Sequence, residues 1–319
     1  MKLVVLVLAY NEEETIKDVI QAINKKLSQL QKFESHVLVV DDGSTDKTGA
    51  FAQELGAIVL SHKVNMGVGK AFQTGLEHVL NLQTDILVNI DADRQFDPDE
   101  ISLLIEPIIN EGCDFVCGDR FTDKSGTVTK PENMSRVKYY GNFAMTKLVS
   151  SLTGKSFTDV SCGYRAYSRK AILMLNLTGK FSYTQESFID LAFKEAVIRN
   201  TPVSVTYYQD RKSKVASNIV LYTLRTLKII VRTYRDYRPM LFFSFLSIPP
   251  FTLSLIGGVF TIVHFITEGG FSPYKFIGFA SIYLFSLAML LWIVGFLADM
   301  FVRVRINQEK VIYLLKTRQ

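Results

Sequence analysis

One segment of the chain reads Thr84-Asp85-Ile86-Leu87-Val88-Asn89-Ile90-Asp91-Ala92-Asp93-Arg94-Gln95, an apolar run followed by alternating polar side chains. The run predicts a buried strand over 85–91. Oxygen-bearing side chains then occupy every second position, at Asp91, Asp93 and Gln95. Such side chains at a strand exit can turn toward one hard cation, and Mg²⁺ needs few protein oxygens because it keeps waters and phosphate oxygens. A solvated acidic loop is the alternative, but the pattern favours a site for a hard cation such as Mg²⁺, which could hold a diphosphate.

Apolar and amphipathic segments alternate over the first 118 residues. Strands are predicted at 2–9, 36–41, 57–61, 85–91 and 114–118, and helices at 13–30, 46–55, 67–82 and 98–111. This alternation predicts an α/β fold with a Rossmann-like, parallel sheet that is covered by helices on both faces. Such sheets bind ligands at the carboxyl ends of their strands, where the acidic segment lies.

The region after residue 118 changes character. A polar loop is predicted at 119–135, helices at 136–152, 168–176 and 184–198, and a strand at 202–207. From 217 to 237 apolar residues recur at helical spacing with basic residues between them. We expect a basic amphipathic helix there that lies on a lipid surface.

Two uncharged runs follow, Met240 to Thr267 and Phe276 to Ala298, and each is long enough to cross a bilayer. Two buried helices of a soluble core are the alternative, which the length of each run disfavours. The expected division is therefore a globular domain at 1–216, a juxtamembrane helix at 217–238, a transmembrane hairpin at 239–302 and a basic tail at 303–319.

Basic residues flank the two runs on their outer sides, whereas the loop between them carries only Lys275. The positive-inside rule then places both termini in the cytoplasm. The start of the chain lacks the pattern of a signal peptide. The net charge of +5 is modest, and the basic residues cluster around the spans. This distribution indicates a membrane surface and not a nucleic-acid partner. The three cysteines form no CxxC pair and suit a reducing compartment.

Polar motifs also follow the other predicted strands. The first strand ends in Ala9-Tyr10-Asn11-Glu12, and the second in Asp41-Asp42-Gly43-Ser44-Thr45-Asp46. Acids there can accept hydrogen bonds from a base and a ribose, or can simply cap the next helix. The turn Asn65-Met66-Gly67-Val68-Gly69-Lys70 only loosely resembles a phosphate loop. Lys70 could still contact a nucleotide.

Several charged residues come later: Arg120, Arg136, Asp159 and the segment Arg211-Lys212-Ser213-Lys214. Each alone is an ordinary surface charge or ion-pair partner. Together the cations could form a pocket for two phosphate groups. An acid such as Asp159 among them would sit where a nucleophile must be oriented.

These motifs occur in an order that is specific for one family. Together with Gly163-Tyr164-Arg165 they make the chain similar, over residues 3–215, to family 2 glycosyltransferases of the GT-A fold. Within that family it resembles the polyprenyl-phosphate glycosyltransferases, such as dolichyl-phosphate mannose synthases and the bacterial GtrB and ArnC-like enzymes. The two-span tail resembles the GtrB type.

The resemblance implies a role for each matching position. Asp91, Asp93 and Gln95 would bind Mg²⁺ or Mn²⁺. Arg120 and Arg136 would hold the acceptor phosphate, and Asp93 and Asp159 would be catalytic. The nucleotide sugar would contact Ala9, Tyr10, Glu12, Asp42, Lys70, Asp91, Ala92, Asp93, Arg211 and Lys214. One departure concerns the Ser213-Lys214 pair, because many relatives have a glycine two residues before it, where this chain has Arg211.

The implied reaction is inverting transfer of a hexose to a polyprenyl phosphate at the cytoplasmic membrane face, with glucose from UDP-glucose as the expected donor. Homo-oligomerisation is left open. One rival is a processive polysaccharide synthase, which would carry a Gln-x-x-Arg-Trp motif, whereas the only tryptophan here is Trp292 within the second span. The other rival is a membrane-anchored nucleotide-sugar sensor without turnover.

Overall fold

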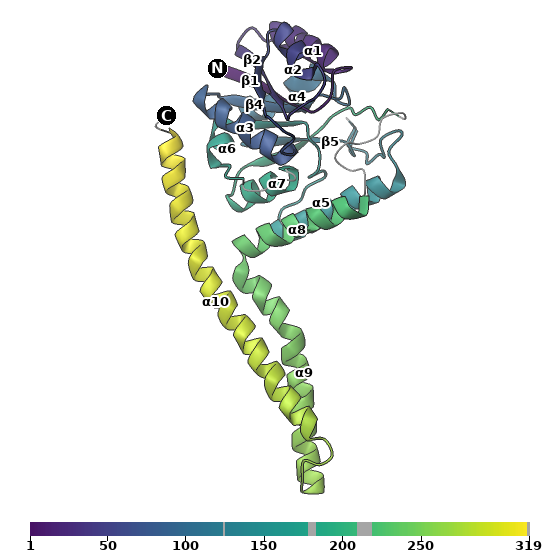
Figure 1. Cartoon of the computed structure of the whole chain (residues 1–319), viewed down its shortest axis with the longest axis vertical. Helices are drawn as coiled ribbons and strands as arrows, with labels where there is room; N and C mark the ends of the chain where they lie inside the picture. Colours follow the sequence, from purple (N-terminus) through teal and green to yellow (C-terminus); the bar gives the residue numbers. More distant parts are fainter. Residues whose placement is uncertain (124, 178–182, 209–218, 318–319) are drawn as a thin grey trace. The chain divides into compact units, whose positions relative to one another are not determined.

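The structure, a computed structural model, describes residues 1–123, 125–177, 183–208 and 219–317 (Figure 1). Its strands are β1 Lys2–Ala9, β2 Glu34–Asp41, β3 Ile58–Ser61, β4 Ile86–Asp91, β5 Phe115–Asp119, β6 Arg165–Ser168 and β7 Ile198–Pro202. Its helices are α1 Ile16–Gln29, α2 Thr48–Glu54, α3 Val68–Asn81, the 3-10 turn η1 Pro98–Glu100, α4 Ile101–Asn110, α5 Arg136–Thr153, α6 Arg169–Met174, α7 Thr184–Phe193, α8 Ile219–Tyr237, α9 Pro239–Glu268 and α10 Lys275–Thr317.

One sheet organises the first part of the chain, with the strand order β3-β2-β1-β4-β6-β5-β7. The predicted α/β fold is confirmed, and the first five strands lie within two residues of their predicted bounds. These five predicted strands run in one direction, as predicted, but the unpredicted strand β6 lies antiparallel between β4 and β5. The sheet is therefore mixed.

Strand β6 is also the element that the sequence pattern missed. The region was predicted to be helical from residue 168, but Arg165, Ala166 and Tyr167 pair with β4 and β5 before α6 begins at Arg169. The strand has only four residues, too few to show an alternating pattern.

Two further bounds differ from prediction. The helix predicted over 184–198 ends at Phe193, because Glu195 takes a positive φ of 60° and turns the chain. The strand predicted at 202–207 begins earlier, at Ile198, where it pairs with Phe115 of β5. Strand β7 ends at Pro202, and beyond it the predicted range contains only the isolated bridge from Val205 to Phe96.

The order of the strands reverses between β1 and β4, since β2 and β3 lie on one side of β1 and β4 on the other. The register aligns their carboxyl ends: Ala9 pairs with Asp41, and Leu8 pairs with Asp91. A reversal of this kind opens a crevice at the carboxyl edge of a doubly wound sheet. The polar motifs predicted at these strand ends therefore share one edge.

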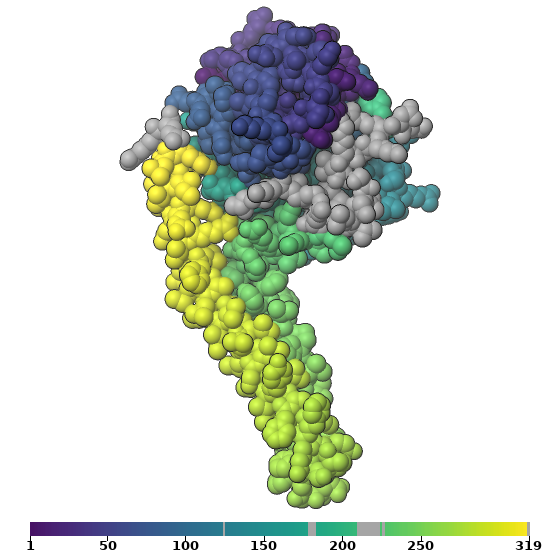
Figure 2. All heavy atoms as spheres, in the orientation of Figure 1, coloured from purple at the N-terminus to yellow at the C-terminus, as the bar shows by residue number. Residues whose placement is uncertain are grey.

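The hydrophobic core lies between the sheet and its helices. The predicted apolar face of α1 is confirmed, because Ile16, Val19, Ile20 and Ile23 are all buried. In Figure 2 the first part of the chain, drawn purple to blue, packs as one dense body. This packing fixes the strand ends from which the site is built.

The chain divides into two compact units, one of Met1–Val231 with Ile312–Gln319 and one of Arg232–Val311. In the second unit α9 and α10 are both long and apolar enough to cross a membrane, as predicted. They pack closely at small residues: a side chain at Gly257 would clash with Ser281, and one at Gly278 would press on Thr261. The basic stretch predicted as a tail at 303–319 continues α10 as helix as far as Thr317.

Candidate functional site

The acidic segment at the end of β4 has the properties of a cation site. The carboxylate of Asp91 has no hydrogen-bond or ion-pair partner in the part of the chain that the structure describes. Burial, and next the charge of Asp93, raise its pKa to about 7. The backbone N–H of Gln95 donates to Asp93 Oδ1 at 3.1 Å, which bends the segment back on itself.

These residues fit a divalent cation that keeps several ligands of its own. No group of three or more His, Cys, Asp or Glu side chains with metal-binding geometry occurs among the described residues. Two carboxylates and an amide suit Mg²⁺ or Mn²⁺, since such ions take part of their shell from water and phosphate oxygens. An unpartnered carboxylate with a raised pKa is what such a cation would neutralise.

The loop after β1 is held against its neighbours by hydrogen bonds. Thr15 Oγ1 donates to Ala92 O at 2.7 Å and lies 3.1 Å from Glu12 Oε2, so Thr15 connects Glu12 with the acidic segment. Asn11, with a positive φ of 53°, accepts from the N–H of Thr45 at 2.8 Å. The Tyr10–Glu12 motif is thus brought beside both Asp91 and the loop after β2.

Asp42 is buried and already has protein partners. Its Oδ1 lies 2.7 Å from His62 Nδ1 and accepts from the N–H of Met66, and its Oδ2 accepts from the N–H of Gly67 at 2.8 Å. Asp42 therefore shapes the turn that leads to Lys70 in the first turn of α3. Gly43 permits the same turn, because a Cβ there would lie 2.4 Å from the backbone of residue 64.

Arg120, which directly follows β5, forms a buried ion pair with Asp159. Arg120 Nε donates to Asp159 Oδ2 at 2.7 Å, and Nη2 donates to Asp159 Oδ1 at 3.1 Å. Asp159 is fully buried, and despite that burial the Arg120 guanidinium holds its pKa below the usual range. The other hydrogen bonds of Arg120 go to Ser161 Oγ at 2.7 Å and Tyr207 Oη at 3.2 Å.

Helix α5 begins with cations beside this pair. Its N-cap is Ser135, whose hydroxyl accepts from the N–H of Lys138. Arg136 is exposed, whereas Lys138 is half-buried with its Nζ 4.6 Å from the ring centre of Tyr207. Lys138 was not among the predicted site residues. The one sequence signal that could have indicated it is its position two residues after Arg136.

The Gly163-Tyr164-Arg165 motif has a structural role. Arg165 is fully buried and donates to the carbonyl oxygens of Val160, Cys162 and Thr184, so it does not line a cationic pocket. Gly163 packs against the acidic segment, since a Cβ there would lie 2.7 Å from Asp91 Oδ2. The motif therefore supports Asp91 from the neighbouring strand.

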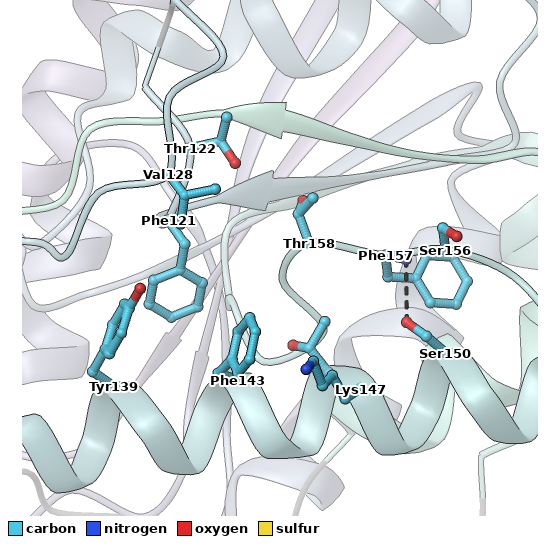
Figure 3. Close-up of a pocket in the computed structure, with 11 residues that line it drawn as sticks. Phe121, Thr122, Val128, Tyr139, Phe143, Lys147, Ser150, Ser156, Phe157 and Thr158 are labelled. Atoms are coloured by element: carbon cyan, nitrogen blue, oxygen red, sulfur yellow. Dashed lines mark hydrogen bonds between the residues drawn. The ribbon is translucent and has the colours of Figure 1, made fainter.

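Two predicted site residues cannot be placed, and one cavity lies outside the predicted site. Arg211 and Lys214 lie outside the described residues. A cavity of about 290 Å³ opens between α5 and the segments around residues 121–128 and 156–158, with Tyr139, Phe143 and Lys147 along its α5 side (Figure 3). None of its lining residues is a predicted site residue, so the candidate site is the sheet edge and not this cavity.

Comparisons with known proteins agree with one another. A model of the family described as "Glycosyl transferase family 2" matches residues 4–173. UDP-N-acetylglucosamine–dolichyl-phosphate N-acetylglucosaminyltransferase of Methanococcus voltae is 31% identical, over 72% of this chain and 97% of its own. Undecaprenyl-phosphate mannosyltransferase of Micrococcus luteus is 27% identical, over 69% of this chain and 90% of its own. Polyprenol monophosphomannose synthase of Mycolicibacterium smegmatis is 29% identical, over 60% of this chain and 70% of its own.

The fold is also found in solved structures. Glucosyl-3-phosphoglycerate synthase from Mycobacterium tuberculosis, crystallised with UDP, matches with a TM-score of 0.57 at 23% identity, over 73% of this chain and 80% of that chain. The same enzyme crystallised with Mn²⁺, UDP and phosphoglyceric acid matches with a TM-score of 0.56 at 22% identity. That match covers 73% of this chain and 78% of that chain. At this identity the likeness establishes a shared fold.

Proposed function

Because the chain belongs to glycosyltransferase family 2 and has a GT-A-like sheet, we propose that it transfers a hexose from a nucleotide sugar to a polyprenyl phosphate. The observation that carries the proposal is the Asp91 carboxylate, which has no partner among the described residues and lies beside Asp93 where the strand order reverses. The polyprenyl-phosphate transferases among the relatives, which match most of this chain, support the acceptor class.

On the donor side we propose that Asp91, Asp93 and Gln95 hold Mg²⁺ or Mn²⁺. When bound, the cation would stabilise the negative charge of the leaving diphosphate. Ala9, Tyr10, Glu12, Lys70 and Ala92 would contact the nucleoside and its phosphates. Asp42 would act from behind them by fixing the turn before Lys70. Arg211 and Lys214 keep their proposed role at the diphosphate.

On the acceptor side we propose that Arg120 and Arg136 meet the lipid phosphate. A phosphate monoester carries most of its second negative charge at neutral pH, since its second pKa is about 6. The attacking oxygen is therefore already anionic and needs no strong general base. Asp159 suits a positioning role, because it is buried and bonded to Arg120. Attack opposite the leaving diphosphate inverts the anomeric centre.

For the sugar we propose UDP-glucose as the first donor to test. The printed name of the relative from Methanococcus voltae includes a UDP-sugar, which supports uridine as the base. The sugars in the names of the three relatives are N-acetylglucosamine and mannose, so both belong in the same assay.

We also propose that the enzyme is an integral membrane protein with α9 and α10 as its spans and both termini in the cytoplasm. The two apolar helices and the basic residues outside them support this arrangement. The division into a catalytic domain at 1–216, an interfacial helix at 217–238, a hairpin at 239–302 and a basic segment at 303–319 belongs to the same proposal.

The test is to incubate membranes that contain the protein with a panel of labelled nucleotide sugars and then to extract the lipid phase. We expect one sugar to enter a lipid whose mass is that of a polyprenyl phosphate plus one hexose. A polymer would favour the processive synthase, and donor binding without any product would favour the sensor.

A further inference from the structure

The charge of Arg120 is already neutralised within the protein. Three of its N–H groups are used by Asp159 and Ser161, and Tyr207 takes another. A guanidinium has five N–H groups, so one is left for a ligand. The Arg120–Asp159 pair therefore has no net charge to set against a phosphate that carries nearly two negative charges.

Lys138 contacts the same tyrosine as Arg120 and lacks an acidic partner among the described residues. No hydrogen bond or ion pair joins its ammonium group to a carboxylate in the described part of the chain. The ammonium instead faces the ring of Tyr207, at 4.6 Å from the ring centre, while the hydroxyl of the same tyrosine accepts from Arg120. Tyr207 thus holds one cation at its face and another at its hydroxyl.

The position of Lys138 is unfavourable without an anion. Burial, and next the charge of Arg120, lower its pKa, whereas the charge of Asp93 raises it. Lys138 and Arg136 also lie in the first turn of α5, where the helix dipole disfavours cations. A phosphate group between Arg120 and Lys138 would remove each of these costs.

We propose that Lys138 is a phosphate-binding residue of this site, and that it and Arg120 contact the acceptor phosphate from two sides of Tyr207. The inference rests on the proposed function and adds a residue to its acceptor side. Lys138 would supply the net positive charge, and Arg120, which its protein partners hold in place, would orient the phosphate. The charge of Asp93 acts on Lys138, which supports an acceptor phosphate close to the proposed metal segment, as direct transfer requires.

The test compares Lys138→Met and Lys138→Arg with Lys147→Met in the full-length protein. Lys147 lies nine residues further along α5, about 180° around the helix, and its Nζ also lies over an aromatic ring, that of Phe143. We expect Lys138→Met to raise the apparent KM for polyprenyl phosphate by about tenfold or more, the value of a charge-assisted hydrogen bond. Donor affinity, measured by calorimetry, should stay near that of the wild type.

The controls separate this role from a structural one. Lys138→Arg keeps the charge and should recover part of the lost acceptor affinity, and Lys147→Met should behave as the wild type. Equal KM values for Lys138→Met and Lys147→Met would overturn the inference. A loss of donor affinity with an unchanged acceptor KM would also overturn it, because Lys138 would then belong to the donor site.

A second measurement needs no variant and covers the case in which Lys138→Met does not fold. Wild-type protein is treated with an amine-reactive reagent, and modification of Lys138 and Lys147 is followed by mass spectrometry. Farnesyl phosphate should protect Lys138 only, and equal modification with and without it would contradict the inference. If the wild type transfers no sugar to any polyprenyl phosphate, the proposed function fails and takes this inference with it.

Discussion

At the scale of single residues, the proposed metal site should respond to pH through Asp91. Burial, and next the charge of Asp93, raise the pKa of its carboxyl from the usual 3.8 to about 7. Between about pH 4 and about pH 7 the folded protein holds a proton that the unfolded chain has released, so this group's contribution to stability weakens as the pH rises through that range. A cation must displace that proton.

The affinity for Mn²⁺ should therefore fall as the pH drops below about 7, by up to about tenfold per pH unit for one proton. Calorimetric titrations at about pH 6 and about pH 8, in buffers of different ionisation enthalpy, measure both the affinity and the released proton. Equal affinities at the two pH values, with no proton released, would show that Asp91 does not bind the metal.

A variant of Asp159 tests whether this residue positions Arg120 or takes part in the reaction directly. Removing its charge leaves the Arg120 guanidinium buried beside a neutral amide, so Asp159→Asn should cost about 3–5 kcal/mol of stability, as breaking a buried pair does. Because its pKa is lowered, the contribution is present at neutral pH and is lost only as the pH falls through that low value. Denaturant unfolding measures the cost.

The matched control is Asp159→Asn combined with Arg120→Met, which removes both charges and should be more stable than Asp159→Asn alone. If Asp159→Asn is as stable as the wild type but inactive, Asp159 takes part in the chemistry directly and the positioning role is wrong.

Sequence patterns predicted some of these residues and not others, for a physical reason. Asp91, Asp93 and Gln95 follow a buried strand in one short segment, so local spacing was enough to group them. Lys138 resembles any surface lysine, and its neighbour Tyr207 lies far along the chain. Such a contact depends on how the sheet brings two segments together, which spacing alone does not encode.

At the scale of elements, the α9–α10 hairpin carries the topology proposal. The basic residues lie outside the two spans, so the loop between them should face away from the cytoplasm. Introducing a thiol by Ser272→Cys should give a protein that reacts with an impermeant reagent from the periplasmic or lumenal side only. The native cysteines are all buried, which keeps the background low. Reaction from the cytoplasmic side only would reverse the orientation.

Elements with a complete pattern were predicted well, and the short ones were not. Strand β1 and helix α1 have long runs of consistent spacing, and both were found within a few residues. Strand β6 has four residues and pairs antiparallel between two strands, so its place is decided by its neighbours. The end of α7 is set by a left-handed turn at Glu195, a residue type that gives no such signal.

At the scale of the whole molecule, the proposed acceptor would explain why one chain carries both a globular α/β fold and two apolar helices. A polyprenyl tail cannot leave the bilayer at small cost, because each exposed CH₂ costs about 0.8 kcal/mol. Its phosphate must be met at the membrane surface. Helix α8 exposes Leu224, Leu227 and Val231, which suits the interfacial position proposed for it.

The most direct test of this account is transfer of label to lipid by purified protein in vesicles that contain polyprenyl phosphate. The wild type should move a labelled hexose into the lipid phase with Mg²⁺ or Mn²⁺ and should stop in EDTA. Asp93→Asn, which removes one charge from the proposed metal segment, should be slower by at least about a hundredfold. Full transfer in chelator, or by Asp93→Asn, would contradict a metal-assisted transfer at the end of β4.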